Sequence, residues 1–219
     1  MKKIFYLFII TLAILSCISC FAFENGDLQY WLTTSMDAKI NNSWKMKADN
    51  ELRFGDSAGT LYYEHVDLGL TYSGLAKWLD VGGNYRLVYE KKGKSWFYEN
   101  RPHINVTLKG SVYDFKLSNR NRLEYRDKET GKDGWRYRNK TAIKYPIKTE
   151  HFNITPYIAD EVFADFIVCE ISENRLYGGV EFKAMDHLYL DIYYMWKANR
   201  KNNVWTNANV IGTQIKLSF

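Results

Sequence analysis

The sequence lacks the cross-links that hold together many small secreted domains. It contains only three cysteines and three prolines. Cys17 and Cys20 lie beside the first apolar run, so removal of that segment would leave Cys169 alone. A single cysteine cannot form an internal disulfide, which excludes a disulfide framework. We expect Cys169 to lie in a loop.

Long hydrophobic runs are also lacking after the N-terminus. No run beyond residue 22 approaches the ~20 residues of a membrane helix, so a chain that spans a membrane must do so with strands. The formal charge of +5 falls to +3 when Lys2 and Lys3 are removed, too little to indicate nucleic acid as a partner. No cluster of His, Cys, Asp and Glu has metal-ligand spacing, so we expect neither metal nor cofactor.

The N-terminus itself has the pattern of a secretory signal peptide. Two lysines precede an almost wholly apolar stretch over 4–18, and Cys20-Phe21-Ala22 places small residues where a signal peptidase cleaves. We predict a signal peptide over 1–22 and a single domain over 23–219. Cys17 and Cys20 each lie in a sequence that loosely resembles a lipoprotein acylation site, so lipidation at either stays an alternative.

The rest of the chain shows alternation of apolar and polar residues. Over 44–54 most even positions are apolar and every odd position is charged, a period of two that indicates a strand with one polar face. Many such segments have about ten residues or more, near the ~9–11 of a membrane barrel strand and above the ~5–6 of soluble strands. The candidate strands are 28–40, 44–54, 61–72, 78–91, 95–109, 112–127, 135–146, 151–163, 174–183, 187–198 and 204–219.

These segments predict an all-β fold, a single up-and-down antiparallel transmembrane β-barrel after a cleaved signal peptide. Eleven candidates do not fit the even strand number of single-chain bacterial barrels. We expect about 12 strands, with 10 as the alternative, and the path of residues 23–30 stays open. Short connections at 41–43, 110–111 and 148–150, against longer ones at 127–134, 164–173 and 199–203, indicate periplasmic turns and outer loops.

Aromatic residues mark the expected membrane boundaries. The seven tryptophans, Trp31 included, lie near ends of candidate strands, as in the aromatic girdles of barrels. The last strand alternates and ends on Phe219, which resembles the signal read by the barrel-assembly machinery. We therefore expect Phe219 to act as an assembly signal. The expected location is the bacterial outer membrane, with its lipid and the assembly machinery as partners.

Several short motifs, taken in order, resemble the DUF2490 family of bacterial outer-membrane barrels. The resemblance covers essentially the whole chain after residue 22. It implies the barrel architecture and no particular activity. The motifs are Glu51-Leu-Arg-Phe-Gly-Asp56, Leu61-Tyr-Tyr-Glu-His65, Asn100-Arg-Pro-His103, Asn121-Arg-Leu-Glu-Tyr-Arg126, Trp135-Arg-Tyr-Arg-Asn139, Pro156-Tyr-Ile-Ala-Asp-Glu161 and Asn174-Arg-Leu-Tyr177.

One sector of the predicted barrel is unusually charged. Three consecutive candidate strands, 95–109, 112–127 and 135–146, carry charged residues two apart, so each set points to one side. They must face the lumen, because an Arg or Lys on the lipid side at mid-bilayer costs about 2–4 kcal/mol. The candidate polar network or solute site comprises Arg53, Asp67, Glu99, Arg101, His103, Arg120, Arg122, Glu124, Arg126, Arg136, Arg138, Lys140, Glu161, Arg175 and Glu181. We expect Glu51, Asp67, Glu161 and Glu181 to supply carboxylates that pair with this sector.

Two interpretations of this network remain open. Paired charges could fill a narrow lumen and fix strand register, which gives a closed structural barrel whose loops carry the interactions. Alternatively, the basic side chains could line a pore that passes or binds small solutes, anionic ones among them. A lipid-modifying enzyme is a third possibility that we do not favour. His65 and His103 face inward with no serine two residues away, and His151 and His187 lie in turns.

Overall fold

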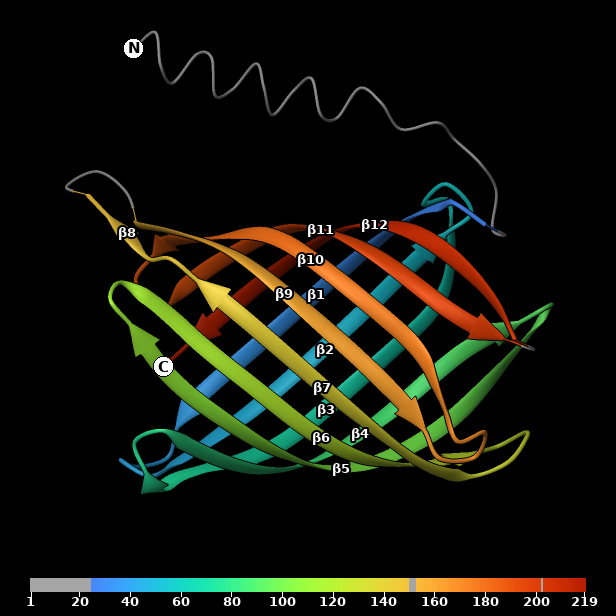
Figure 1. The fold of residues 1–219 in the computed structure, drawn as a ribbon, viewed down its shortest axis with the longest axis horizontal. Coiled ribbons are helices and arrows are strands. Elements are labelled where there is room, and N and C mark those ends of the chain that lie inside the picture. The colour runs from blue at the N-terminus through green and yellow to red at the C-terminus, as the bar shows by residue number, and fades with distance from the viewer. Residues whose placement is uncertain (1–24, 150–152, 202) are drawn as a thin grey trace, which may run out of the picture.

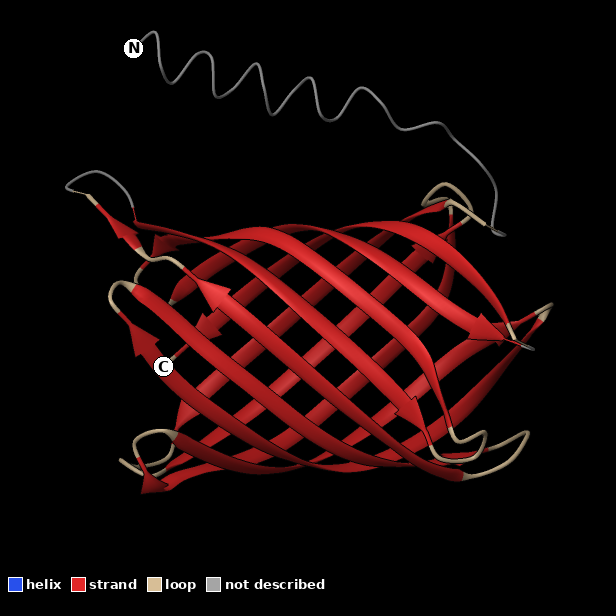
Figure 2. Ribbon diagram, viewed as in Figure 1, coloured by secondary structure: helices blue, strands red, loops and turns tan. Residues whose placement is uncertain are grey.

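The computed structural model describes residues 25–149, 153–201 and 203–219. Within these ranges the chain forms one sheet that closes on itself, which confirms the predicted all-β barrel (Figure 1; Figure 2). The predicted signal peptide, with Cys17 and Cys20, lies outside the described residues. The strands are β1 (Asp27–Lys39), β2 (Trp44–Gly55), β3 (Thr60–Ala76), β4 (Leu79–Lys92), β5 (Ser95–Val112), β6 (Phe115–Lys128), β7 (Gly134–Lys144), β8 (Ile147–Lys148), β9 (Asn153–Asp165), β10 (Glu170–Met185), β11 (Leu188–Lys201) and β12 (Val204–Ser218).

The way the barrel closes explains the odd number of candidate strands. β8 has two residues and pairs only with β9, so eleven long strands form the described wall. Neighbours run antiparallel except β1 and β12, which run parallel from Asp27↔Ala208 to Asp37↔Ser218. An odd number of strands that alternate in direction must close through one parallel pair. The expectation of a wholly antiparallel barrel is therefore wrong at this pair, and β1 begins at the end opposite the C-terminus (Figure 1).

The connections differ from the expected contrast between short and long. β5 continues through Gly110 and Ser111, so the turn predicted there is wrong. Pairing of Val112 with Phe115 extends the ladder, and the chain turns at Tyr113 and Asp114 instead. The link from β7 to β9 holds β8, so Lys148 of the turn expected at 148–150 lies in a short strand, and residue 150 lies outside the described residues. Cys169 does lie in a loop, exposed between β9 and β10.

Alternation along the strands separates an inner face from an outer face. Six of the seven tryptophans are exposed on the outside, whereas Trp31 points into the lumen with 2% of its surface exposed. Trp31 is therefore not part of a girdle, because its odd position in β1 shares the inward side with Thr33 and Ser35. Among the described residues, no helix is long and apolar enough to cross a membrane.

The apolar core of the lumen lies against β1 and β9–β12. Trp31, Tyr177, Met195 and Val210 are buried there, and Tyr157 and Tyr193 pack on them; we call these six residues the aromatic sector. Tyr193 of β11 pairs in register with Gly212 of β12. A Cβ at Gly212 would lie 2.0 Å from Cζ of the Tyr193 ring, so only glycine leaves room for this packing.

Candidate functional site in the barrel lumen

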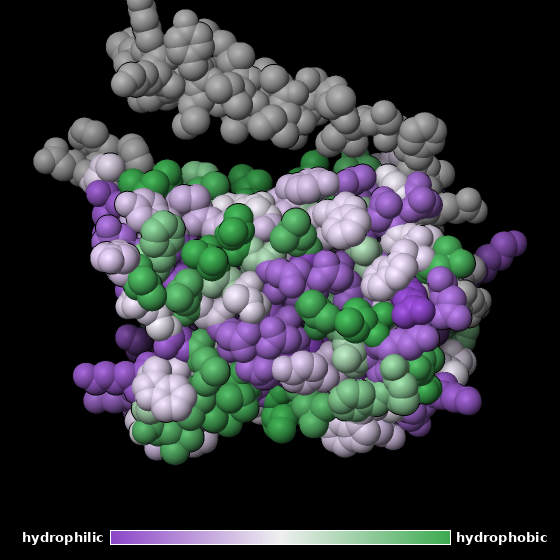
Figure 3. Space-filling model, viewed as in Figure 1, coloured by the Kyte–Doolittle hydropathy of each residue, from purple (hydrophilic) through white to green (hydrophobic). Residues whose placement is uncertain are grey.

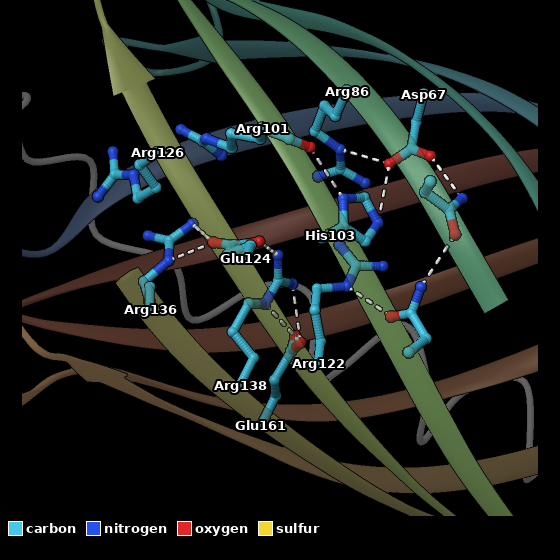
Figure 4. A network of polar contacts seen from close by, with 12 residues as sticks. Asp67, Arg86, Arg101, His103, Arg122, Glu124, Arg126, Arg136, Arg138 and Glu161 are labelled. Carbon is cyan, nitrogen blue, oxygen red and sulfur yellow. Dashed lines mark hydrogen bonds and ion pairs between the residues drawn. The ribbon is translucent and has the colours of Figure 1, made fainter. Parts of the chain in front are cut away.

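Side chains from β3–β7 and β9 converge inside the barrel (Figure 4). The ionic sector, as we call this set, consists of Asp67, Arg86, Glu99, Arg101, His103, Arg120, Arg122, Glu124, Arg126, Arg136, Arg138 and Glu161. A buried charge is stable only when it is paired and hydrogen-bonded, so the partners of each group decide what the sector can do. The buried charged and histidine side chains of the inner wall are Asp27, Asp49, Arg53, His65, Asp67, Arg86, Glu99, Arg101, His103, Arg122, Glu124, Arg136, Arg138, Glu161 and Arg175.

Glu161 accepts hydrogen bonds from three side chains on three different strands. Arg120 Nη2 donates to Oε1 at 2.6 Å, and Arg138 Nη2 donates to the same oxygen at 2.7 Å. The Tyr177 hydroxyl donates to Oε2 at 3.0 Å, and Arg175 Nη1 lies 4.0 Å from that oxygen. Glu161 is 1% exposed. One carboxylate therefore holds side chains from β6, β7 and β10 in fixed positions.

Two further carboxylates extend this network toward the end of the barrel where β1 begins. Glu124 pairs with Arg136 and lies 3.5 Å from Arg138 Nη1, so Arg138 bridges Glu124 and Glu161. Glu99 accepts from Arg101 Nε at 2.6 Å and from Arg126 Nε at 2.6 Å. Arginine forks shared between carboxylates give charge-assisted bonds of defined geometry.

A separate group surrounds Asp67 of β3. Arg86 Nε donates to it at 2.7 Å, Asn84 Nδ2 donates at 2.7 Å, and His103 Nε2 lies 3.5 Å away. Asp49 of β2 forms a hydrogen bond with His65 at 2.9 Å. His65 and His103 therefore each contact an aspartate and belong to the network of the lumen wall.

Arginines also stack on aromatic rings where the two sectors meet. The Arg53 guanidinium carbon lies 3.6 Å from the Trp31 ring centroid and 3.9 Å from that of Tyr63, while Nη2 is 2.6 Å from Glu51. Arg138 and Arg175 each lie 4.5 Å from the Phe163 ring centroid. Stacking and ion pairing together restrict these side chains to one position.

Several inward cations, Arg122, Lys140 and Lys197 among them, have no carboxylate within ion-pair distance in the described part of the chain. Arg122 Nε donates to Asn105 Oδ1 at 2.8 Å, but its buried Nη1 has no hydrogen-bond partner. Lys140 lies 3.8 Å from the Tyr177 ring centroid, and Lys197 lies 5.7 Å from that of Trp31. The lumen wall thus holds positive charge that its own acids do not pair.

Two neighbouring cavities in the lumen share part of their lining among the described residues. The larger, about 640 Å³, opens toward the end where β1 begins, and the smaller, about 170 Å³, lies nearer the middle. Four arginines from strands spread around the barrel line both, so they stand where the cavities meet. We call these residues, Arg53, Arg86, Arg138 and Arg175, the arginine collar.

The wall of the larger cavity is strongly basic. Its ten cationic residues far outnumber its three carboxylates, Glu90, Asp165 and Glu173. A concave surface with one sign of charge attracts and concentrates ions of the opposite sign. The cations are Arg53, Arg86, Arg101, Arg126, Lys128, Arg136, Arg138, Arg175, Lys197 and Arg200.

The structure brings most of the predicted network together, but not all of it. The carboxylates expected to accept from the charged sector of β5–β7 divide: Glu161 pairs with Arg120 and Arg138 of that sector, whereas Glu51 pairs with Arg53 and Asp67 with Arg86. Glu181 pairs with Lys144 near the Phe219 end, away from the sector. Alternation along its strand correctly predicts that Glu181 faces the lumen. It does not predict how far along the barrel axis Glu181 lies, and this position keeps it away from the charged sector.

Sequence reasoning missed several residues of the site. Arg86, Glu173 and Lys197 line the larger cavity, and Trp31 and Phe163 supply the rings on which the arginines stack. For Arg86 the signal was available, since it alternates with Leu87 and Tyr85 within a predicted strand. Trp31 and Phe163 carried no such signal, because an aromatic residue suits either face.

The described ranges contain no group of three or more His, Cys, Asp or Glu side chains placed to hold a metal ion.

Phe219 is exposed at the barrel end, where its backbone N–H donates to Asp37 O at 2.9 Å and its ring stacks on His187. Its role as an assembly signal stays a prediction.

Comparison with known proteins agrees with this architecture. A family model described as "Protein of unknown function (DUF2490)" matches residues 28–208. Among solved structures, the NanC porin in its rhombohedral crystal form is similar at 12% sequence identity, covering 87% of this chain and 99% of that chain with a TM-score of 0.55. Identity at that level shows a shared fold and no shared solute. No curated protein matches the sequence.

Proposed function

This chain belongs to the DUF2490 family and has a porin-like β-barrel fold, and from that premise we propose that it lies in the outer membrane and binds and passes small anionic solutes through its lumen. The observation that carries the proposal is the excess of cations over carboxylates in the larger cavity, which leads to the arginine collar. Rings of arginine and lysine select anions in pores by the same electrostatics. The proposed role is transport, not catalysis.

The geometry supports a path with a wide entrance and a narrow middle. The larger cavity would gather anions, and the collar would admit only those small enough to pass between guanidinium groups held by stacking and ion pairs. Arg122 and Lys140 line the smaller cavity beyond the collar without carboxylate partners, so they would receive the anion next.

Export and insertion form part of the same proposal. Residues 1–22 would direct the chain across the inner membrane, and the β12 strand with Phe219 would be read by the assembly machinery. The Phe219 end would then face the periplasm. The basic entrance lies at the opposite end, so it would open to the outside.

Conductance of the purified barrel in a planar lipid bilayer tests the proposal. We expect channel events with an anion preference, measured from the reversal potential in a salt gradient. The double substitution Arg122→Gln and Lys197→Gln should lower that preference without unfolding the barrel, because neither cation lies within ion-pair distance of a carboxylate among the described residues. The double substitution Lys77→Gln and Lys148→Gln, an equal loss of charge at two exposed positions in the β3–β4 turn and in β8, is the matched control. Absence of channels, or a cation preference, contradicts the proposal.

A closed structural barrel is the second candidate. It is favoured by the ion pairing of all four collar arginines, with Glu51, Asp67, Glu161 and Glu173. In that case Arg138→Ala should lower thermal stability and leave permeability to small solutes unchanged in a liposome-swelling assay. A change in permeability would count against closure.

A further inference from the structure

A strip of polar side chains crosses the outer face of the barrel, on strands whose inner face forms part of the ionic sector. Its members are adjacent in register: Asn121 pairs with Asn139, and Asn119 with Thr141, which pairs with Asp160. Figure 3 shows a hydrophilic area at this place, in the middle of the face formed by β6, β7, β9 and β10. The exterior strip consists of Asn119, Asn121, Asn139, Thr141, Asp160 and Asn174.

The strip is hydrogen-bonded internally but not saturated. Asn121 Nδ2 donates to Asn119 Oδ1 at 2.7 Å, and Asn139 Nδ2 donates to Asn121 Oδ1 at 2.9 Å. Asp160 receives one hydrogen bond, from Asn174 Nδ2 at 2.8 Å, and has no cationic partner among the described residues. Thr141 and Asp160 are exposed. A carboxylate oxygen accepts more than one bond, so Asp160 retains unfilled capacity that points outward.

The surroundings of the strip are apolar. Trp135, Ile143, Ile158 and Leu176 on the same strands are between 38% and 61% exposed. The wall of β3 and β5 at corresponding positions carries only aliphatic outward side chains in this region, namely Val66, Leu68, Leu70, Ile104, Val106 and Leu108. The strip thus contrasts with the aliphatic wall of β3 and β5.

Lipid does not suit such a strip. Hydrocarbon offers no hydrogen-bond partner, and polar or ionisable groups that face it are costly. The strip lies midway along β6, β7 and β9, so it cannot reach headgroup water at either end of the strands. A protein surface that supplies donors and acceptors would remove this cost.

We propose that the exterior strip is an interface at which a second copy of this chain docks. A symmetric contact uses the same surface on both partners, so that surface must complement itself. Four asparagines and a threonine meet this condition because amides and hydroxyls both donate and accept. Each copy also brings amide donors for the Asp160 carboxylate of the other, and the apolar rim closes around the contact. The inference is independent of the solute that the lumen takes.

Cysteine cross-linking in native membranes tests the contact. In a Cys169→Ser background, Thr141→Cys should yield a disulfide-linked dimer on mild oxidation, seen on a non-reducing gel. Leu68→Cys, on the wall of β3, is the matched control and should give no dimer above background. Equal cross-linking of the two variants, or none from Thr141→Cys, overturns the proposal.

A second measurement does not depend on an engineered cysteine. Native mass spectrometry of the wild-type barrel, released from nanodiscs, should show multiples of the single-chain mass. The double variant Asn139→Leu and Asp160→Leu should show only the mass of a single chain. It should still keep the heat-modifiable gel mobility of a folded barrel. A wild-type monomer that carries only bound lipid, or a complex with a chain of different mass, contradicts docking of a second copy.

Discussion

The two sectors of the lumen wall stabilise the barrel by different means. The aromatic sector against β1 and β9–β12 fills space with large rings that need few polar partners. The ionic sector fills space with guanidinium and carboxylate groups, each of which depends on its partner. A change in the first sector removes packing, whereas a change in the second leaves an unpaired charge. The two should therefore respond very differently to conservative substitutions.

Removal of one ionic carboxylate should have the largest effect. Glu161→Gln removes the negative charge that Arg120 and Arg138 share, and it replaces one acceptor oxygen by an amide group that can only donate. Loss of one partner from a buried ion pair typically costs about 3–5 kcal/mol. We expect a destabilisation of that order in urea titrations of the barrel in lipid vesicles, followed by tryptophan fluorescence.

The outward Glu64 supplies a control for this substitution. It forms no ion pair with any described residue, so Glu64→Gln should change the free energy of unfolding little. Equal effects of the two substitutions would mean that the ionic sector does not hold the wall together.

The hydroxyl that joins the two sectors should matter less. Tyr177 packs in the aromatic sector, and its OH donates to Glu161 Oε2. Tyr177→Phe keeps the ring and removes the hydroxyl that makes this bond, and hydrogen bonds to charged groups contribute about 1.5–3 kcal/mol. We expect a loss within that range by the same titration.

Tyr193→Phe is the matched control within the aromatic sector. The Tyr193 ring packs beside Tyr177 with centroids 5.8 Å apart, and its hydroxyl has no hydrogen-bond partner among the described residues. If it destabilises the barrel as much as Tyr177→Phe does, ring packing and not the link to Glu161 explains the result.

The comparison of sectors also shows what the sequence could reveal. Alternation located the long strands and the inward side of Arg122, Glu124 and Arg138, because a period of two follows from strand geometry. It could not give the parallel closure of β1 on β12, since direction in the wall depends on the number of strands. It could not identify the aromatic sector either, because an aromatic side chain at a strand position suits lipid and lumen alike.

The position of each inward residue along the barrel axis was the other quantity that the sequence did not give. Glu161 and Glu181 both lie on inward faces, yet only Glu161 reaches Arg120 and Arg138. The stagger between strands decides which inward residues share a level, and stagger follows from turn positions that the sequence specified poorly. The shift of one turn from Gly110 to Tyr113 moves every predicted neighbour along that ladder.

Glu181 gives the smallest expected effect and defines the limit of the ionic sector. It pairs with Lys144, but both side chains are 35% exposed, so water screens the charge that remains after Glu181→Gln. Partly exposed ion pairs contribute up to about 1 kcal/mol and weaken with salt. We expect at most that loss in the urea titration, shrinking further in high salt. A loss as large as that of Glu161→Gln would show that the ionic sector extends to the Phe219 end and is not confined to the middle of the barrel.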